Sequence, residues 1–103
     1  MNRGEVRWYR FTHPDKKRPV VILTRDSILE YLGEVTIAPI TSTIRGIPSE
    51  VVLGQSDGMP RECAINLDHV QTVAKGRVGA LIATLPTRRW VEIRSALLFS
   101  LGF

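Results

Sequence analysis

The stretch that decides the fold reads Lys17-Arg18-Pro19-Val20-Val21-Ile22-Leu23-Thr24. Pro19 fixes its own φ near about −65° and biases Arg18 toward extended backbone, so a cationic turn is joined rigidly to the next segment. Val20 to Leu23 is an unbroken, largely β-branched apolar run, which predicts a strand buried on both faces. An arginine at the mouth of a rigid strand suits anion recognition, although a surface arginine that merely precedes a core strand gives the same pattern.

The segments on either side of this stretch are short and mostly alternate apolar and polar residues, as half-buried strands do. Pro39 cannot donate a ladder hydrogen bond, so we expect an edge or a bulge there. Thr12 to Arg18 is a polar, cationic turn, and Asp26 to Gly33 is either one helical turn or a loop. The expected strands are Glu5 to Phe11, Pro19 to Thr24, Glu34 to Ile40, Glu50 to Leu53, Glu62 to Leu67, His69 to Val73 and Ala80 to Ala83.

The hydrophobic period changes near the end of the chain. Trp90, Ile93, Leu97 and Leu101 follow the spacing i, i+3, i+7 and i+11, which places them on one face of a helix. Thr84 or Thr87 is the expected cap at its start, and Gly102 is placed to end it.

Strands first and one helix last is an α+β layout, mainly β. Short strands at intervals of about ten residues favour a small β-barrel, partly covered by the C-terminal helix. The length of 103 residues and the absence of a linker-like or repeated segment predict a single domain over residues 1–103.

Composition narrows the class of partner. The chain has 14 Lys and Arg against 10 Asp and Glu and a pI of about 9.8, which favours nucleic acid or an acidic protein. No apolar stretch approaches a membrane span, and no signal peptide is visible, so we expect a cytoplasmic protein that does not contact the membrane. The single cysteine, Cys63, fits a reducing compartment.

Metal and cofactor chemistry finds little support in the residues. Cys63 and the two histidines have no zinc spacing, no acidic cluster suggests magnesium, and Cys63 reads as a small buried hydrophobe. There is no phosphate-binding glycine loop and no nucleophile elbow. We therefore expect no metal site and no cofactor.

Two polar groups remain as candidates. One is the cationic run Lys16-Lys17-Arg18, and the other is the hydroxyl run Thr41-Ser42-Thr43. Each adjoins a strand, so both can open at the same end of a barrel, and cations and hydroxyls are the usual donors to phosphate oxygens. Taken singly, each run is typical of an ordinary solvated turn, and Trp8 and Trp90 are more typical of a core than of a base-stacking surface.

Five pieces of the chain, in order, resemble the MazF/PemK family of toxin–antitoxin ribonucleases. They are Arg3-Gly4-Glu5-Val6, Arg18-Pro19-Val20-Val21-Ile22-Leu23, Ala38-Pro39-Ile40-Thr41-Ser42, Ile47-Pro48-Ser49-Glu50-Val51 and Ala96-Leu97-Leu98-Phe99-Ser100-Leu101-Gly102. The resemblance covers almost the whole length. It implies an SH3-like small β-barrel of the CcdB/PemK/MazF type with a C-terminal α-helix, assembled as a homodimer.

The resemblance also implies an activity: a type II toxin that cuts single-stranded RNA at short sequence motifs without a metal. The ribose 2′-OH would act as nucleophile and leave 2′,3′-cyclic phosphate and 5′-OH ends. The catalytic pair carried over to this sequence is Arg18 and Thr41. A cognate acidic antitoxin would occupy the same groove, in agreement with the basic pI.

Further RNA contacts are expected around this pair, and they leave the proton acceptor open. Arg18 suits charge stabilisation or proton donation to the leaving 5′-oxygen, because a guanidinium with a pKa above about 12 is a poor base. The base is then His13, His69, Asp15 or solvent. His69 stands where many family members carry Gln, and the turn from His13 to Arg18 is shorter than usual, so an atypical cleavage sequence is expected. The RNA-binding set is His13, Asp15, Lys17, Ser42, Asp68, His69 and Gln71.

Two other functions compete with this one. A related barrel poisons a protein target such as DNA gyrase and has no nuclease activity. A plain SH3-like module would bind nucleic acid with a steep salt dependence and leave it intact.

Overall fold

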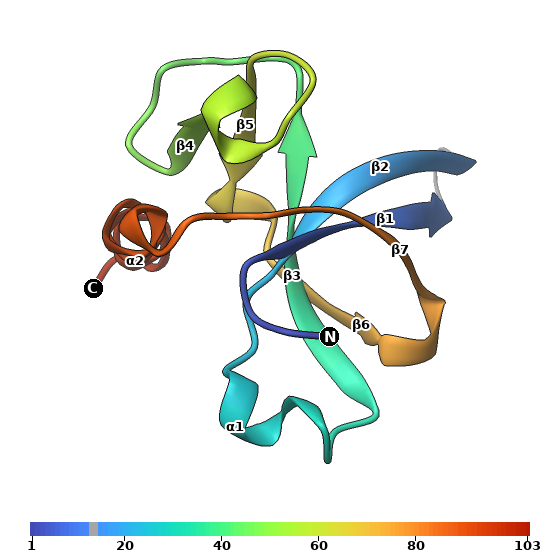
Figure 1. Ribbon diagram of the computed structural model, residues 1–103. Helices are drawn as coiled ribbons and strands as arrows, with labels where there is room; N and C mark the ends of the chain where they lie inside the picture. The colour runs from blue at the N-terminus through green and yellow to red at the C-terminus, as the bar shows by residue number, and fades with distance from the viewer. Residues whose placement is uncertain (13–14) are drawn as a thin grey trace.

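The chain folds into an antiparallel sheet flanked by a C-terminal helix in the computed structural model, which describes residues 1–12 and 15–103 (Figure 1). The strands are β1 Glu5–Thr12, β2 Asp15–Ile22, β3 Glu34–Thr41, β4 Glu50–Leu53, β5 Cys63–Asn66, β6 Gln71–Ala74 and β7 Val78–Thr84. The helices are α1 Asp26–Leu29 and α2 Trp90–Leu101, with 3₁₀ turns η1 Gln55–Asp57, η2 Leu67–His69, η3 Lys75–Arg77 and η4 Thr87–Arg89.

The sheet is built around β3. Its strand order is β4-β5-β3-β2-β1-β7, and β6 also pairs with β3. All these pairs are antiparallel, and the sheet bends so that β7 passes over β1 (Figure 1). The predicted class, mainly β with a barrel-like sheet and a C-terminal helix, is confirmed, although the hydrogen-bonded ladder does not close within the described residues.

The apolar run that begins at Val20 is buried on both faces, as predicted. Val20, Val21 and Ile22 are each 0% exposed. Val21 belongs to the apolar cluster that also holds Ile93 of α2, whereas Val20 and Ile22 belong to a second cluster. Alternate side chains of one strand thus join two cores, and burial of each contributes about 1.5–3 kcal/mol.

The cationic residues before this run are not in a turn, contrary to expectation. β2 begins at Asp15, and its ladder with β1 pairs Lys17 with Arg10 and Arg18 with Tyr9. Pairing with β1 therefore extends the strand through residues whose polar sequence does not by itself predict a strand. The strand also ends at Ile22, two residues before the expected end.

Later elements also differ in their bounds. His69 lies in η2, so β6 begins only at Gln71. The strand expected at Ala80 to Ala83 is longer and runs from Val78 to Thr84, because it pairs along β1.

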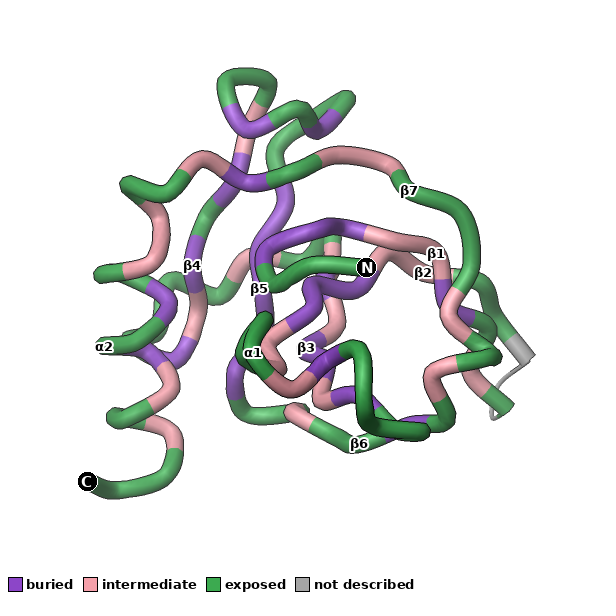
Figure 2. Tube along the Cα trace, turned by 60° about the horizontal axis from the view of Figure 1, so that its bottom comes forward, coloured by how far each residue is buried: buried purple, intermediate pink, exposed green. Residues whose placement is uncertain are grey.

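Helix α2 packs against β4 and η2, and Figure 2 shows its buried stripe turned toward β4. The buried residues are Ile93 and Ala96, whereas Leu101 is 62% exposed and does not share the buried face. The predicted threonine caps are wrong, because the 3₁₀ turn η4 precedes the helix. The N-cap residue of α2 is Arg89, whose side chain makes no capping hydrogen bond. Gly102 ends the helix in the left-handed conformation, at φ 81°, as expected.

An ion pair ties the start of α2 to the turn after β4. Asp57 is buried, and the Arg89 guanidinium donates from Nε to Oδ1 and from Nη2 to Oδ2, both at 2.9 Å. The Gly54 N–H donates to Oδ2 as well, at 3.0 Å. Hydrogen bonds from Arg89, opposed by burial, hold the pKa of the Asp57 carboxyl below its usual value.

Within the described residues, no helix has both the length and the apolar character needed to cross a membrane.

Candidate functional site

Strands β2 and β3 separate at a fork that lies beyond two prolines. Their ladder runs from Ile22↔Ile37 to Val20↔Pro39 and ends there. Past this point β2 stays with β1, while β3 continues through Ile40 and Thr41 paired to β5 (Figure 1). Pro19 and Pro39 have no N–H to donate, which removes the means of extending the ladder.

The register carries Arg18 and Thr41 to opposite arms of this fork. In each residue pair of the β2–β3 ladder the residue numbers sum to 59, as in 20 and 39 or 21 and 38. The same register, continued by two residues, sets Arg18 opposite Thr41. The predicted catalytic pair therefore faces across the fork, although the two residues lie far apart in the sequence.

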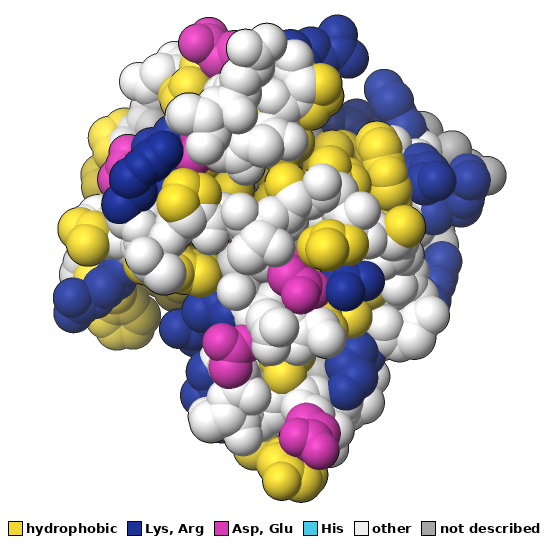
Figure 3. Space-filling view, viewed as in Figure 1, with side chains coloured by type: hydrophobic (Ala, Val, Ile, Leu, Met, Phe, Trp, Pro, Cys, Tyr) yellow, Lys and Arg dark blue, Asp and Glu magenta, His cyan; other side chains and the backbone are white. Residues whose placement is uncertain are grey.

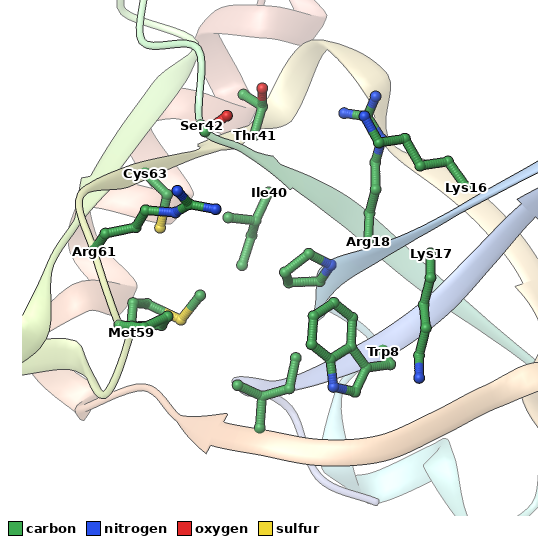
Figure 4. Close-up of a pocket in the computed structure, with 13 residues that line it drawn as sticks. Trp8, Lys16, Lys17, Arg18, Ile40, Thr41, Ser42, Met59, Arg61 and Cys63 are labelled. Carbon is green, nitrogen blue, oxygen red and sulfur yellow. The ribbon is translucent and has the colours of Figure 1, made fainter. Parts of the chain in front are cut away.

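A cavity of about 320 Å³ opens at the fork (Figure 4). The β1–β2 hairpin, the end of β3, the segment between η1 and β5, and β7 all supply residues to its wall. Those residues are Trp8, Lys16, Lys17, Arg18, Pro19, Ile40, Thr41, Ser42, Met59, Pro60, Arg61, Cys63 and Ile82. The cationic run and two residues of the hydroxyl run, Thr41 and Ser42, thus line one cavity, whereas Thr43 is not among its lining residues.

The electrostatic character of this cavity is one-sided. Among the described lining residues, four are cationic and none is acidic. Among the described residues, neither Arg18 nor Arg61 makes a side-chain hydrogen bond or an ion pair. Lys17 places its Nζ 5.2 Å from the centroid of the Trp8 ring. Figure 3 shows Lys and Arg side chains gathered over the ends of β1 and β2. Such a surface attracts an anion.

Thr41 is oriented to donate a hydrogen bond. Its Oγ1 accepts from the backbone N–H of Thr43 at 3.1 Å, and no acceptor among the described residues takes its own proton. The floor beneath these polar groups is apolar and includes Pro19, Ile40 and Met59. Hydroxyl and guanidinium donors above an apolar surface interact more strongly with an anion than they would in water.

Cys63 lies in the wall of the cavity and is buried, as expected for a small apolar residue. Burial raises the pKa of its thiol, with the Asp57 carboxylate adding to that rise. The thiol is therefore neutral near pH 7 and is a weak nucleophile.

Of the remaining predicted RNA contacts, Asp68, His69 and Gln71 do not line this cavity. Asp68 accepts a hydrogen bond from Ser49 at 2.5 Å, and His69 is exposed on η2. Gln71 pairs with Ile37 on the edge of β3 away from β2. His13 lies outside the described residues, and of Asp15 only the backbone is described, at the start of β2. All of these stay predictions as RNA contacts.

Trp8, Met59 and Arg61 are lining residues that sequence reasoning did not place at the site. Arg61 belongs to an irregular segment before β5 and has no motif around it. Trp8 was expected in a core; it is only partly buried and pairs with Pro19 across the β1–β2 ladder. Within the described part of the chain, no group of three or more His, Cys, Asp or Glu side chains is arranged to hold a metal ion.

Comparison with known proteins gives consistent matches. The family model described as PemK-like, MazF-like toxin of type II toxin–antitoxin system matches residues 2–101. "Probable endoribonuclease MazF5" of Mycobacterium tuberculosis is 48% identical over 73 residues, which are 70% of this chain and 66% of that protein. "Probable endoribonuclease MazF2" of the same species is 34% identical over 103 residues, 99% of each chain.

Solved structures agree with the sequence relatives. The Mycobacterium tuberculosis toxin MazF-mt6 superposes with a TM-score of 0.88 at 29% identity and covers 96% of this chain and 97% of its own. A MazE–MazF structure from Deinococcus radiodurans gives a TM-score of 0.80 at 26% identity, covering 100% and 96%.

Proposed function

The chain belongs to the PemK-like, MazF-like toxin family of type II toxin–antitoxin systems, and from this premise we propose that it is an endoribonuclease that cuts single-stranded RNA at the fork between β2 and β3. The observation that carries the proposal is the convergence of Arg18 and Thr41 on one cavity whose described lining has cationic and hydroxyl donors and no carboxylate. The relatives named as endoribonucleases support the same activity.

The proposed reaction is an in-line displacement at phosphorus. The 2′-oxygen forms a bond to the phosphorus, the bond to the 5′-oxygen breaks, and the products carry a 2′,3′-cyclic phosphate and a 5′-OH. Negative charge grows on the phosphoryl oxygens, where the Arg18 guanidinium and the Thr41 hydroxyl donate hydrogen bonds. No step of this scheme requires a metal.

Two protons move in this reaction. The 2′-OH loses one to a base, for which His13, Asp15, His69 and solvent are the candidates. The leaving 5′-oxygen gains one from Arg18 or from solvent. Arg18 is not the base, because its guanidinium is already protonated at neutral pH and has no free lone pair with which to accept a proton.

The same cavity suits two kinds of polyanion. Single-stranded RNA is the substrate, and an acidic segment of a cognate antitoxin competes for the cationic lining, which fits the relation to the MazE–MazF structure.

We place the protein in the cytoplasm as a homodimer. Helix α2 leaves Val91, Phe99 and Leu101 exposed, an apolar surface of the kind that a subunit interface covers.

One incubation tests the activity. A long single-stranded RNA is treated with the protein in EDTA, beside Arg18→Ala, Thr41→Val and, as a matched control, Arg25→Ala, an exposed arginine that does not line the cavity. We expect defined cuts from the wild type and from Arg25→Ala, a large loss of cutting by Arg18→Ala and a smaller loss by Thr41→Val. The new 5′ ends should accept phosphate from a kinase without prior phosphatase treatment.

The outcomes separate the candidate functions. Intact RNA that is nevertheless bound would indicate a non-catalytic module, and intact, unbound RNA would favour a protein target such as gyrase. Normal cutting by both Arg18→Ala and Thr41→Val would remove these residues from the mechanism.

A further inference from the structure

Arg61 lines the cavity from a different segment than the other cationic residues do. It lies in the segment between η1 and β5, whereas the other three cationic lining residues, Lys16, Lys17 and Arg18, all belong to β2. Figure 4 shows its guanidinium pointing toward Ile40 and the middle of the cavity. It therefore faces the fork from the side opposite to Arg18.

The backbone that carries Arg61 is held in place on both sides. Met59 and Cys63, two residues before and after it, are 5% and 6% exposed. Gly58 has φ 87°, and a Cβ there would lie 3.0 Å from the Cβ of Ala83, so the turn into this segment needs glycine. The guanidinium is thus presented by a rigid segment and not by a loose loop.

Arg61 has no role within the fold that the structure reveals. Among the described residues its side chain makes no hydrogen bond and no ion pair, although Glu62 is its neighbour in the chain. It is exposed, and the residues below it are apolar. A planar, donor-rich group above an apolar floor is an arrangement that accepts a flat ring with acceptor atoms on its edge.

We propose that the cavity holds the base of a nucleotide adjoining the scissile phosphate and that Arg61 reads this base, favouring guanine over adenine. The inference rests on the proposed function, since it takes Arg18 and Thr41 as the phosphate site. Pro19, Ile40 and Met59 form the surface on which the ring lies. A volume of about 320 Å³ is at the small end of ligand sites and suits one nucleotide.

The preference for guanine follows from the donors. A guanidinium has five N–H donors and no acceptor, so it pairs with the O6 and N7 acceptors of guanine. Adenine carries an amino group where guanine carries O6. The guanidinium N–H and the adenine N6–H would then face each other as two donors with no acceptor. The other cations of the cavity also only donate, so none of them compensates for that mismatch.

The test compares sequence preference and not activity alone. A random-sequence single-stranded RNA pool is cut in EDTA by the wild type, by Arg61→Gln and by Arg25→Gln as the matched control. We expect the wild type and Arg25→Gln to favour G over A about tenfold at one position next to the cut. In Arg61→Gln that ratio falls to within about twofold, while poorly favoured sequences are cut at nearly the same rate as before.

A binding measurement keeps this inference separate from the cleavage proposal. Two uncleavable 2′-O-methyl oligonucleotides, all uridine except for one central G or A, are titrated with the same three proteins. Loss of the G preference in Arg61→Gln alone supports base reading, even if the wild type cuts nothing. An equal loss of affinity for both oligonucleotides, with a shallower salt dependence, would show that Arg61 contacts a phosphate. An unchanged G preference would show that Arg61 does not take part in recognition. Either result overturns the proposal.

Discussion

Two arginines of this domain, Arg89 and Arg18, have opposite surroundings. Arg89 donates to both oxygens of buried Asp57, to the Val52 carbonyl at 2.7 Å and to Glu92 at 2.6 Å. Arg18 lies at the fork of β2 and β3 among other cations and, within the described residues, makes no ion pair.

The difference shows how the same side chain serves stability in one place and function in another. Arg89 has all its anionic partners inside the fold, so its interactions are formed once the chain is folded. Arg18 has donors without acceptors, beside like charges, and an external phosphate completes its surroundings. Changes at Arg89 should therefore appear in unfolding, and changes at Arg18 should appear in RNA cleavage.

The largest effect is expected from Arg89→Met. It leaves the Asp57 carboxylate buried without its partner, which should lower the free energy of unfolding by about 3–5 kcal/mol. Urea denaturation measures the loss. The double variant Asp57→Asn with Arg89→Met, which removes both charges, should regain part of it. A loss below about 1 kcal/mol in the single variant would show that the ion pair between Asp57 and Arg89 does not stabilise the fold.

Arg18→Ala is the matched change at the fork. Loss of a preorganised donor to the developing charge should slow RNA cleavage about 10²–10³-fold. The unfolding free energy should stay within about 0.5 kcal/mol of the wild type, because no partner inside the described fold is lost. Arg18→Lys should be intermediate, since it keeps the charge and loses the planar pair of donors. A stability loss equal to that of Arg89→Met would contradict the division between the two arginines.

Thr41→Val tests the second arm of the fork with a smaller expected effect. The variant keeps the shape and removes the hydroxyl, so cleavage should slow about tenfold, the equivalent of one hydrogen bond of about 1.4 kcal/mol. Single-turnover rates at saturating protein isolate the chemical step. An unchanged rate would mean that the phosphoryl oxygen does not contact Thr41.

The smallest effect concerns pH. The pKa of Asp57 is lowered in the folded protein, mainly by Arg89, so its stabilisation is fully present above the unfolded pKa of about 3.9 and is lost as pH falls through the folded value. The stability advantage of the wild type over the double variant at positions 57 and 89 should therefore shrink below about pH 4. A constant difference from pH 6 to pH 2 would show that Asp57 does not titrate as described.

The sequence predicted the arrangement of strands better than their ends. Alternation and β-branched runs located β1 and β3, and the apolar run from Val20 identified the doubly buried strand. Lys16 to Arg18 did not read as strand, because their extended backbone comes from pairing with β1 and not from local preference.

The site was predicted in part for a similar reason. Arg18 and Thr41 each adjoin a strand with a recognisable pattern, so their convergence followed from the family resemblance and the strand order. Arg61 carries no local signal, and the 32-residue separation of Asp57 and Arg89 is bridged only by tertiary packing. Partners defined by the fold as a whole leave little trace in a single sequence.

The most direct measurement follows the Nε–H resonances of both arginines by NMR as an uncleavable 2′-O-methyl oligonucleotide is added. We predict that the Arg18 resonance shifts and becomes protected from exchange with water as phosphate binds, while that of Arg89, already bonded to Asp57 at 2.9 Å, stays at its original position. An Arg18 resonance that does not respond to saturating oligonucleotide would contradict the central claim that the fork is the phosphate site.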